Sequence, residues 1–186
     1  MDKTWKKIIW ENVEVIIIAL LIVIPIRYFV IQPFIVKGSS MEPNFYTNDY
    51  LIIDEISYRF RQPQRYEVIV LKAPNHPEEY YIKRIIGLPN ETVVINNGQV
   101  KVITPNNETI NIDESYLPPN TLTSGNLTIT LKPNQYFALG DNRAVSYDSR
   151  NWGPFDKSLI VGRVWLRLWP LNRITIFNNY HNAYAK

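Results

Sequence analysis

The chain contains 186 residues, of which 46% are hydrophobic, and its 20 Lys and Arg against 17 Asp and Glu give a net charge of +3. The hydrophobic fraction excludes a disordered chain, and so small a basic excess argues against a nucleic-acid-binding protein. With no cysteine and two histidines, His76 and His181, the sequence excludes a disulfide framework, a thiol nucleophile and a multi-histidine metal centre. We therefore expect no metal or other cofactor.

The first element in chain order is an apolar run near the N-terminus. Residues Val15–Ile26 carry no charge, and after Arg27 the run resumes over residues 28–31. As a helix, about 17 residues with a rise of about 1.5 Å each would span about 25 Å, near the lower limit for a bilayer crossing. This shortness slightly favours a buried core helix. A cleaved signal peptide is rejected, because no small-residue cleavage site follows the run.

We interpret residues 1–34 as a cytoplasmic N-terminus followed by an uncleaved transmembrane anchor. Lys3, Lys6 and Lys7 precede the apolar run, and Lys37 is the only positive residue shortly after it. Positive residues are retained on the cytoplasmic side of a membrane. The asymmetry predicts a single pass through the cell membrane, with the rest of the chain outside the cytoplasm.

Residues 35–186 are predicted to form one extracytoplasmic domain with a mainly β fold, an antiparallel β-barrel or sheet. Runs rich in β-branched and aromatic residues predict strands over residues 50–55, 67–71, 79–86, 92–95, 127–131, 135–139 and 160–168. Asn97-Gly98 predicts a hairpin, because a type I′ turn needs two residues that accept positive φ. Residues 104–126, rich in Asn, Pro, Thr and Ser, predict a variable loop excursion.

Three segments carry groups that could perform chemistry. Gly38-Ser39-Ser40 lies between an apolar stretch and Pro43, where a hydroxyl could be exposed; taken alone, it is more often an ordinary turn. Lys83 lies in a strand-like run, and its alternative role is that of an edge-strand lysine. Residues 140–150 form a dense polar run that is either a solvated loop or a support for a site.

A serine and a lysine are sufficient for nucleophilic catalysis if the lysine is neutral. A serine hydroxyl needs a base to remove its proton, and neither histidine lies in a polar cluster. Only about one lysine in a thousand is neutral near pH 7.5 at the ordinary pKa of about 10.4, and lowering that pKa by about two units makes roughly a tenth neutral. The apolar neighbours of Lys83 favour such a shift, because burial disfavours the ammonium. A nearby Arg84 would act in the same direction.

Together, the three segments resemble the bacterial type I signal peptidases. The serine box of that family, Ser-Met-x-Pro, is present at residues 40–43, and its lysine box at residues 81–89. Its third box, Gly-Asp-Asn-Arg-x-x-Ser-x-Asp-Ser-Arg, is matched throughout residues 140–150. The resemblance covers roughly residues 29–175 in the order of the family, behind an anchor in the expected place.

The resemblance implies a role for each motif. Ser40 would be the nucleophile, with Ser39 as its neighbour, and Lys83 the general base. The implied supporting residues are Ser146, which would hydrogen-bond the Lys83 amine, the ion pair of Asp148 and Arg150, and the loop residues Asp141, Asn142 and Arg143. The implied substrate-binding residues are Phe34, Val36, Met41, Tyr81 and Ile82.

Two departures from the family pattern are visible. Gly38 stands where some members have a serine whose hydroxyl donates to the oxyanion, so the oxyanion hole is expected to depend mainly on the Ser40 backbone N–H. Asn44 and Phe45 replace the usual Thr-Leu, and both fit a turn that leads into a strand.

The activity implied is that of a membrane-bound serine endopeptidase that removes signal peptides from secretory preproteins and cleaves after small residues in an A-x-A pattern. Its partners would be preproteins and membrane lipid. The alternatives are another Ser–Lys peptidase, of the organelle inner-membrane or self-cleaving repressor type, and a non-catalytic membrane-anchored β domain that binds a partner. A repressor should carry a regulatory segment where the anchor lies, and a binding domain should fail to cut an Ala-x-Ala peptide.

Overall fold

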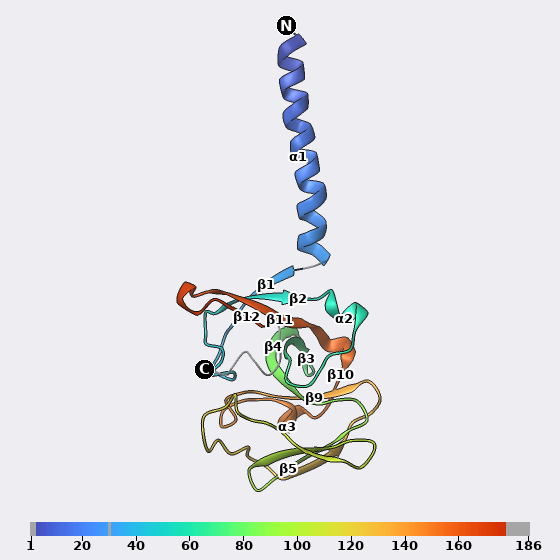
Figure 1. Ribbon diagram of the computed structural model, residues 1–186, viewed down its shortest axis with the longest axis vertical. Helices are drawn as coiled ribbons and strands as arrows, with labels where there is room; N and C mark the ends of the chain where they lie inside the picture. Colours follow the sequence, from blue (N-terminus) through green and yellow to red (C-terminus); the bar gives the residue numbers. More distant parts are fainter. Residues whose placement is uncertain (1–2, 30, 178–186) are drawn as a thin grey trace.

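The computed structural model describes residues 3–29 and 31–177, so His181 lies outside the described residues. A helix of 27 residues, α1 (Lys3–Phe29), projects from one end of a β-rich body (Figure 1). In the portion of the chain described, none of the helices meets the length and hydropathy required of a membrane span.

The chain leaves the helix earlier than the apolar run suggested. Residues Ile31–Ile35 form strand β1, which pairs antiparallel with β2 (Tyr50–Asp54). The end of the segment that we had assigned to the anchor therefore belongs to the sheet. The apolar residues of this part of the segment are compatible with either a helix or a strand. Pro33 suits β1 because this is the terminal strand of the sheet, where a missing N–H is tolerated.

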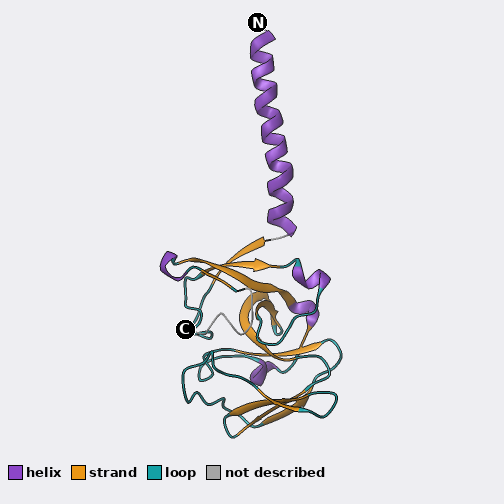
Figure 2. Cartoon of the chain, viewed as in Figure 1, coloured by secondary structure: helices purple, strands orange, loops and turns teal. Residues whose placement is uncertain are grey.

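The body consists mainly of antiparallel strands with short helical turns between them (Figure 2). After β2, the elements are α2 (Ser57–Phe60), β3 (Val68–Ala73), β4 (His76–Gly87), β5 (Thr92–Asn96), β6 (Gln99–Ile103), β7 (Thr109–Asn111), β8 (Leu127–Thr130), β9 (Gln135–Leu139), α3 (Ser149–Trp152), β10 (Phe155–Asp156), the 3₁₀ turn η1 (Lys157–Leu159), β11 (Ile160–Trp169), the 3₁₀ turn η2 (Leu171–Arg173) and β12 (Thr175–Ile176).

Within the described residues, these strands form two sheets. An eight-stranded sheet follows the order β1-β2-β11-β3-β4-β9-β10, with β12 paired to β11, and a four-stranded sheet follows the order β7-β6-β5-β8. Of the two predicted forms, barrel or sheet, the described residues adopt open antiparallel sheets, because the terminal strands β1 and β10 do not pair with each other to close a barrel. In Figure 1 the smaller sheet lies at the end of the body opposite α1.

The alternation of side chains explains how the sheets pack. In β3, Val68 and Val70 join one buried cluster, whereas Ile69 and Leu71 join another. The larger sheet is therefore covered on both faces here, which a continuous apolar run favours. The β5–β6 hairpin turns at Asn97 and Gly98 with φ of 50° and 78°, as the sequence predicted.

The segment at residues 104–126 is more ordered than its composition suggested. It contains β7, which pairs with β6, and it buries Ile112, Tyr116 and Leu117. These few apolar residues lie in a stretch rich in polar turn residues and proline, so the composition pointed to a loop. The segment therefore packs against the body, and it reaches the polar loop at residues 140–150 through hydrogen bonds described below.

Candidate functional site

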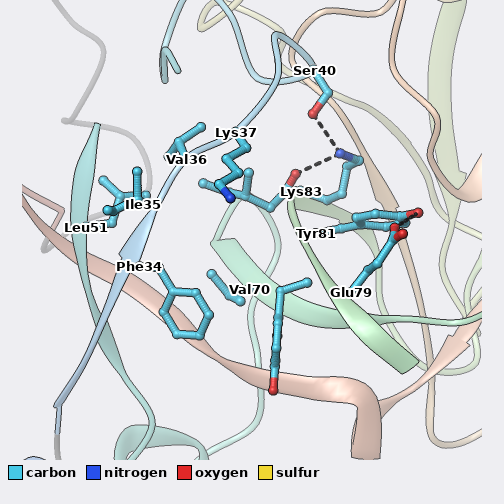
Figure 3. Close-up of a pocket in the computed structure, with 12 residues that line it drawn as sticks. Phe34, Ile35, Val36, Lys37, Ser40, Leu51, Val70, Glu79, Tyr81 and Lys83 are labelled. Atoms are coloured by element: carbon cyan, nitrogen blue, oxygen red, sulfur yellow. Dashed lines mark hydrogen bonds between the residues drawn. The ribbon is translucent and has the colours of Figure 1, made fainter. Parts of the chain in front are cut away.

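The structure brings Ser40 and Lys83 together. Ser40 lies in the turn that follows β1, and Lys83 lies in β4. The Nζ atom of Lys83 is 2.8 Å from the Ser40 Oγ atom and 2.9 Å from the Ile82 carbonyl oxygen (Figure 3). A neutral amine at this distance can accept the hydroxyl proton.

Lys83 is held in a dry environment. The residue is only 3% exposed, and Nζ lies 5.5 Å from the centre of the Tyr81 ring. Burial lowers the pKa of Lys83 from 10.5 to about 8, although the charges of Asp148 and Asp141 act in the opposite direction. Desolvation dominates because water no longer stabilises the ammonium.

Arg84 makes no direct contribution to this environment, contrary to the possibility raised by the sequence. Side chains alternate along a strand, so Arg84 leaves the face of β4 opposite to Lys83. Its guanidinium binds Asp141 through two hydrogen bonds of 2.8 and 2.6 Å, and each of the two side chains is 1% exposed. The buried ion pair joins β4 to the loop at residues 140–150.

Asp148 organises the second half of that loop. Its carboxylate accepts two hydrogen bonds of 2.8 Å from the Arg150 guanidinium. The same carboxylate accepts the backbone N–H groups of Gly140, at 3.0 Å, and Arg150, at 3.2 Å, and the latter caps the short helix α3. One buried carboxylate therefore joins both ends of the loop, which closes it on itself beside Lys83.

Ser146 is placed near the pair but does not make the expected hydrogen bond. Its Oγ atom is buried and, within the described residues, has no hydrogen-bond partner. A Cβ atom added at Gly140 would lie 2.1 Å from this oxygen and 2.5 Å from the Ser40 carbonyl oxygen, so Ser146 packs close against that backbone. Lys83 instead donates to Ser40 and to the Ile82 carbonyl, because these acceptors belong to its own strand and to the facing turn.

Asn142 and Arg143 connect the loop to its surroundings. Asn142 donates its backbone N–H to the Ser40 carbonyl at 3.0 Å and its side-chain amide to the Ser39 carbonyl at 3.1 Å. Arg143 is buried, and its guanidinium donates to Glu114, Thr123 and the Tyr116 hydroxyl. No sequence pattern indicated that the segment at residues 104–126 supports this loop, because partners distant in sequence leave no local pattern.

A cleft of about 500 Å³ leads to Ser40 and Lys83. Four of the five predicted substrate-binding residues line it, namely Phe34, Val36, Tyr81 and Ile82. Residues that the sequence analysis did not select also line the cleft, among them Lys37 and Glu79 (Figure 3). Tyr80 is a further one. Tyr80 could have been found from its position in the lysine-containing strand, but its contact with Phe34, with ring centres 5.4 Å apart, depends on the fold.

The structure corrects the prediction that Met41 binds the substrate. Its side chain is fully buried in the cluster that also contains Phe45 and Leu51. Its sulfur atom accepts the Asp141 backbone N–H at 3.4 Å. Met41 therefore packs behind the Ser40 turn and does not line the cleft, because the turn directs neighbouring side chains to opposite sides.

The described residues contain no group of three His, Asp or Glu side chains positioned to hold a metal ion. The chemistry that the arrangement supports is acyl transfer, because a hydroxyl, a buried amine and a cleft for an extended chain converge on one point.

The residues that form this site lie within a segment that matches a known family. The model of the family described as signal peptidase, peptidase S26, matches residues 9–169. The chain is similar to a probable signal peptidase I-2 from a Synechocystis species, with 37% identity over 185 residues that cover 96% of this chain and 79% of the relative. It is similar to signal peptidase I P from Bacillus subtilis subsp. natto, with 34% identity over 183 residues that cover 93% and 96% of the two chains. A crystal structure of a signal peptidase I from Enterococcus faecalis matches 56% of this chain and 97% of its own, with 27% identity and a TM-score of 0.46.

Proposed function

The chain belongs to the signal peptidase family, peptidase S26, and we propose that it removes signal peptides from exported preproteins with Ser40 as nucleophile and Lys83 as general base. The observation that carries this proposal is the 2.8 Å distance between the Nζ atom of Lys83 and the Oγ atom of Ser40, in a lysine that is only 3% exposed. An amine that is dry and adjacent to a hydroxyl is suited to accept its proton near neutral pH.

In the first half of the proposed reaction, the Ser40 hydroxyl gives its proton to the neutral Lys83 amine while Oγ attacks the scissile carbonyl carbon. The backbone N–H of Ser40 donates to the oxyanion that forms. The carbon–nitrogen bond then breaks, and the Lys83 ammonium protonates the leaving amine. This leaves an acyl-enzyme and returns Lys83 to its neutral form.

In the second half, Lys83 takes a proton from a water molecule, which attacks the ester carbonyl. Collapse of this second tetrahedral intermediate breaks the bond to Oγ, and the ammonium returns the proton to Ser40. The arrangement is a Ser–Lys variant of the nucleophile and base pair of serine proteases. Asp148, Arg150 and Asp141 support the reaction by fixing the loop beside the amine.

The substrate is proposed to bind as an extended strand between β1 and β4. On one side of β4, β3 pairs with residues up to Arg84, whereas on the other side β9 pairs only from Arg84 onwards. The edge of β4 over residues 81–83 therefore remains available for an added strand. This is shorter than the edge over residues 81–86 that the sequence suggested, because β9 occupies the rest.

The walls of the cleft favour small side chains in the substrate. Phe34 and Ile82 lie on facing strands, and the buried Leu51 and Val70 close the cleft between them. An extended chain directs alternate side chains to one side, so two small residues separated by one residue fit this shape. This agrees with cleavage after an A-x-A pattern.

The N-terminal segment is proposed to anchor the protein in the cell membrane, with its N-terminus in the cytoplasm and the domain from residue 35 outside. The side chains of the described stretch Val15–Leu21 are exposed, and α1 stands away from the body (Figure 1). A helix that is apolar on all sides is stable when lipid or protein covers it. Carbonate extraction should leave the full chain in the membrane pellet, and release into the supernatant would exclude the anchor.

The same end of the body exposes apolar side chains suited to contact lipid. Ile35, Trp169, Leu171 and Ile174 are each more than half exposed. They belong to β1, β11 and the segment after it, which lie nearest α1 (Figure 1). Lipid contact here would hold the cleft at the membrane surface, where the cleavage site of a preprotein emerges.

The proposed activity is tested with the full chain in detergent and a peptide that contains one Ala-x-Ala site. Mass spectrometry should show a single cut after the second Ala. Ser40→Ala should be inactive, whereas Ser158→Ala, which changes an exposed serine away from the cleft, should cut as the wild type does. Cleavage by Ser40→Ala, or no cleavage by the wild type, would overturn the proposal.

A further inference from the structure

The two peptide groups that flank Ser40 are both bound by one residue of the polar loop. Asn142 donates its side-chain N–H to the Ser39 carbonyl at 3.1 Å and its backbone N–H to the Ser40 carbonyl at 3.0 Å. The Ser39 carbonyl also accepts the Glu42 N–H at 3.1 Å. The Ser40 N–H itself donates to no group among the described residues.

We propose that Asn142 is a positioning residue that holds the Ser39–Ser40 peptide so that the Ser40 N–H faces the oxyanion. This inference rests on the proposed function. In a planar trans peptide, the C=O and N–H bonds point in opposite directions. By holding the Ser39 carbonyl toward its own side-chain amide, Asn142 directs the Ser40 N–H away from that amide, so that it can face an oxyanion that forms at the Ser40 hydroxyl.

The hydrogen bonds also strengthen the Ser40 N–H as a donor. Two donors on the Ser39 carbonyl polarise the peptide group, and chains of hydrogen bonds reinforce one another in this way. The effect matters in this chain because Gly38 has no side-chain hydroxyl that could supply a second donor. One well-oriented donor then carries most of the stabilisation of the oxyanion.

The hydrogen bonds of Asn142 require the loop to come close to the Ser40 turn, and Gly140 permits this. Asn142 can reach the Ser40 carbonyl because the chain passes it at Gly140, where an added Cβ atom would lie 2.5 Å from that carbonyl oxygen. Asp141, between them, is fixed by Arg84. The two residues that precede Asn142 are thus held in place against the Ser40 turn.

The test compares Asn142→Asp, Asn142→Ala and a control, Asn106→Ala, which changes an exposed asparagine in the segment before β7. Asp has the shape of Asn without its N–H donor, and Ala removes the side chain without adding charge. Cleavage of the Ala-x-Ala peptide is measured on the alkaline plateau of the pH profile. A new carboxylate that raises the pKa of Lys83 then does not affect the comparison.

Both Asn142 variants should lose about tenfold to a hundredfold in kcat with KM changed less than about twofold, because removal of an oxyanion donor itself costs about 10²–10³ in kcat. Inhibition by a peptide aldehyde that ends in Ala should weaken by a similar factor, because its addition to Ser40 Oγ forms a hemiacetal whose oxyanion needs the same N–H. The melting temperature should stay within about 2 °C of the wild type.

Three results would overturn the inference. One is a kcat within about threefold of the wild type in both variants, well below the cost of a lost oxyanion interaction. Another is a loss of kcat with unchanged aldehyde inhibition or with a lower melting temperature, which would indicate a structural role only. The third is an equal loss in Ser39→Ala, which would assign the missing donor to the Ser39 hydroxyl. Absence of cleavage by the wild type would instead refute the proposed function itself.

Discussion

Lys83 and Arg84 are adjacent and buried in β4, yet only Arg84 is paired with a carboxylate. The Lys83 amine lies beside a hydroxyl and a carbonyl, and no carboxylate among the described residues forms a hydrogen bond with it. The Arg84 guanidinium forms a two-fold hydrogen-bonded ion pair with Asp141. Burial without a charged partner favours the neutral amine, whereas burial with one preserves the charge. The strand thus places a reactive, neutral amine next to a structural cation.

Lys83→Arg should abolish turnover while the fold survives. A guanidinium remains protonated at all working pH values, so it cannot accept the Ser40 proton. The expected loss in kcat is about 1,000-fold or more, at the upper range for removal of a general base. Lys72→Arg, on the exposed side of the neighbouring strand β3, is the control and should keep full activity. Substantial turnover by Lys83→Arg would refute the role of the amine.

Activity should rise with pH through the pKa of Lys83. Burial lowers this pKa from 10.5 to about 8, and only the neutral amine is a base. The logarithm of kcat/KM should therefore increase with a slope of one below about pH 8 and level off above it, because this parameter reports the free enzyme. A midpoint near the ordinary lysine value would show that the amine is solvated.

Lys83→Met should stabilise the protein near pH 7. The pKa of Lys83 falls from 10.5 when unfolded to about 8 when folded, so folding disfavours the ammonium by about 3 kcal/mol below pH 8. After the loss of two hydrogen bonds, we expect a gain of about 1–3 kcal/mol in the free energy of unfolding.

The size of this effect depends on pH in a defined way. The penalty is complete below pH 8 and shrinks between pH 8 and 10.5, because above that value the amine is neutral in both states. Urea unfolding at pH 7 and at pH 10.5 should therefore show a gain for Lys83→Met that decreases at the higher pH. A loss of stability at pH 7 would contradict the desolvation of Lys83.

Arg84→Met should destabilise the fold strongly. It leaves the Asp141 carboxylate buried without its ion-pair partner, at a cost of about 3–5 kcal/mol in the free energy of unfolding. Arg163→Met is a useful comparison, because Arg163 pairs with Asp54 at side-chain exposures of 15% and 17% and should cost about 1 kcal/mol. Equal costs in urea unfolding would mean that burial does not control these pairs.

Ser146→Ala should separate activity from stability. The Ser146 Oγ atom is buried without a partner among the described residues, so its removal should not lower the free energy of unfolding. If Ser146 orients the amine during the reaction, as the family resemblance implies, kcat should fall about tenfold to a hundredfold.

Ser149→Ala should show the opposite pattern, a loss of stability with little loss of activity. The Ser149 Oγ atom accepts the Ala138 N–H at 3.1 Å, so its removal should cost about 1 kcal/mol of stability with little effect on kcat. Unchanged kcat in Ser146→Ala would remove Ser146 from the proposed mechanism.

Local patterns in the sequence were sufficient to locate much of the fold. Alternating β-branched and aromatic residues marked strands such as β5 and β11, and Asn97-Gly98 marked the hairpin. Such signals depend on each residue and its immediate neighbours, which is why they can be read directly. Strands β7, β10 and β12 were not predicted, because two or three residues carry too little periodicity, and β1 was not predicted because its apolar residues continue the run assigned to the anchor.

The motifs also identified the residues that meet at the site, but not how they meet. Ser40 and Lys83 were selected from the sequence, as were the cleft residues Phe34 and Ile82. The burial of Met41 and the solitary hydroxyl of Ser146 were not foreseen. Both depend on which side of a turn a side chain takes, and that choice is made by packing against distant segments.

The sequence by itself determined that this protein has a serine, a lysine and a polar loop in the order of a known family, on a mainly β framework. Only the tertiary structure decided that the amine is dry, that Arg84 is neutralised by Asp141, and that Asn142 binds the peptides on both sides of Ser40. The reason is that desolvation and charge act through space. They are summed over all groups that folding brings near an atom, whatever their separation along the chain.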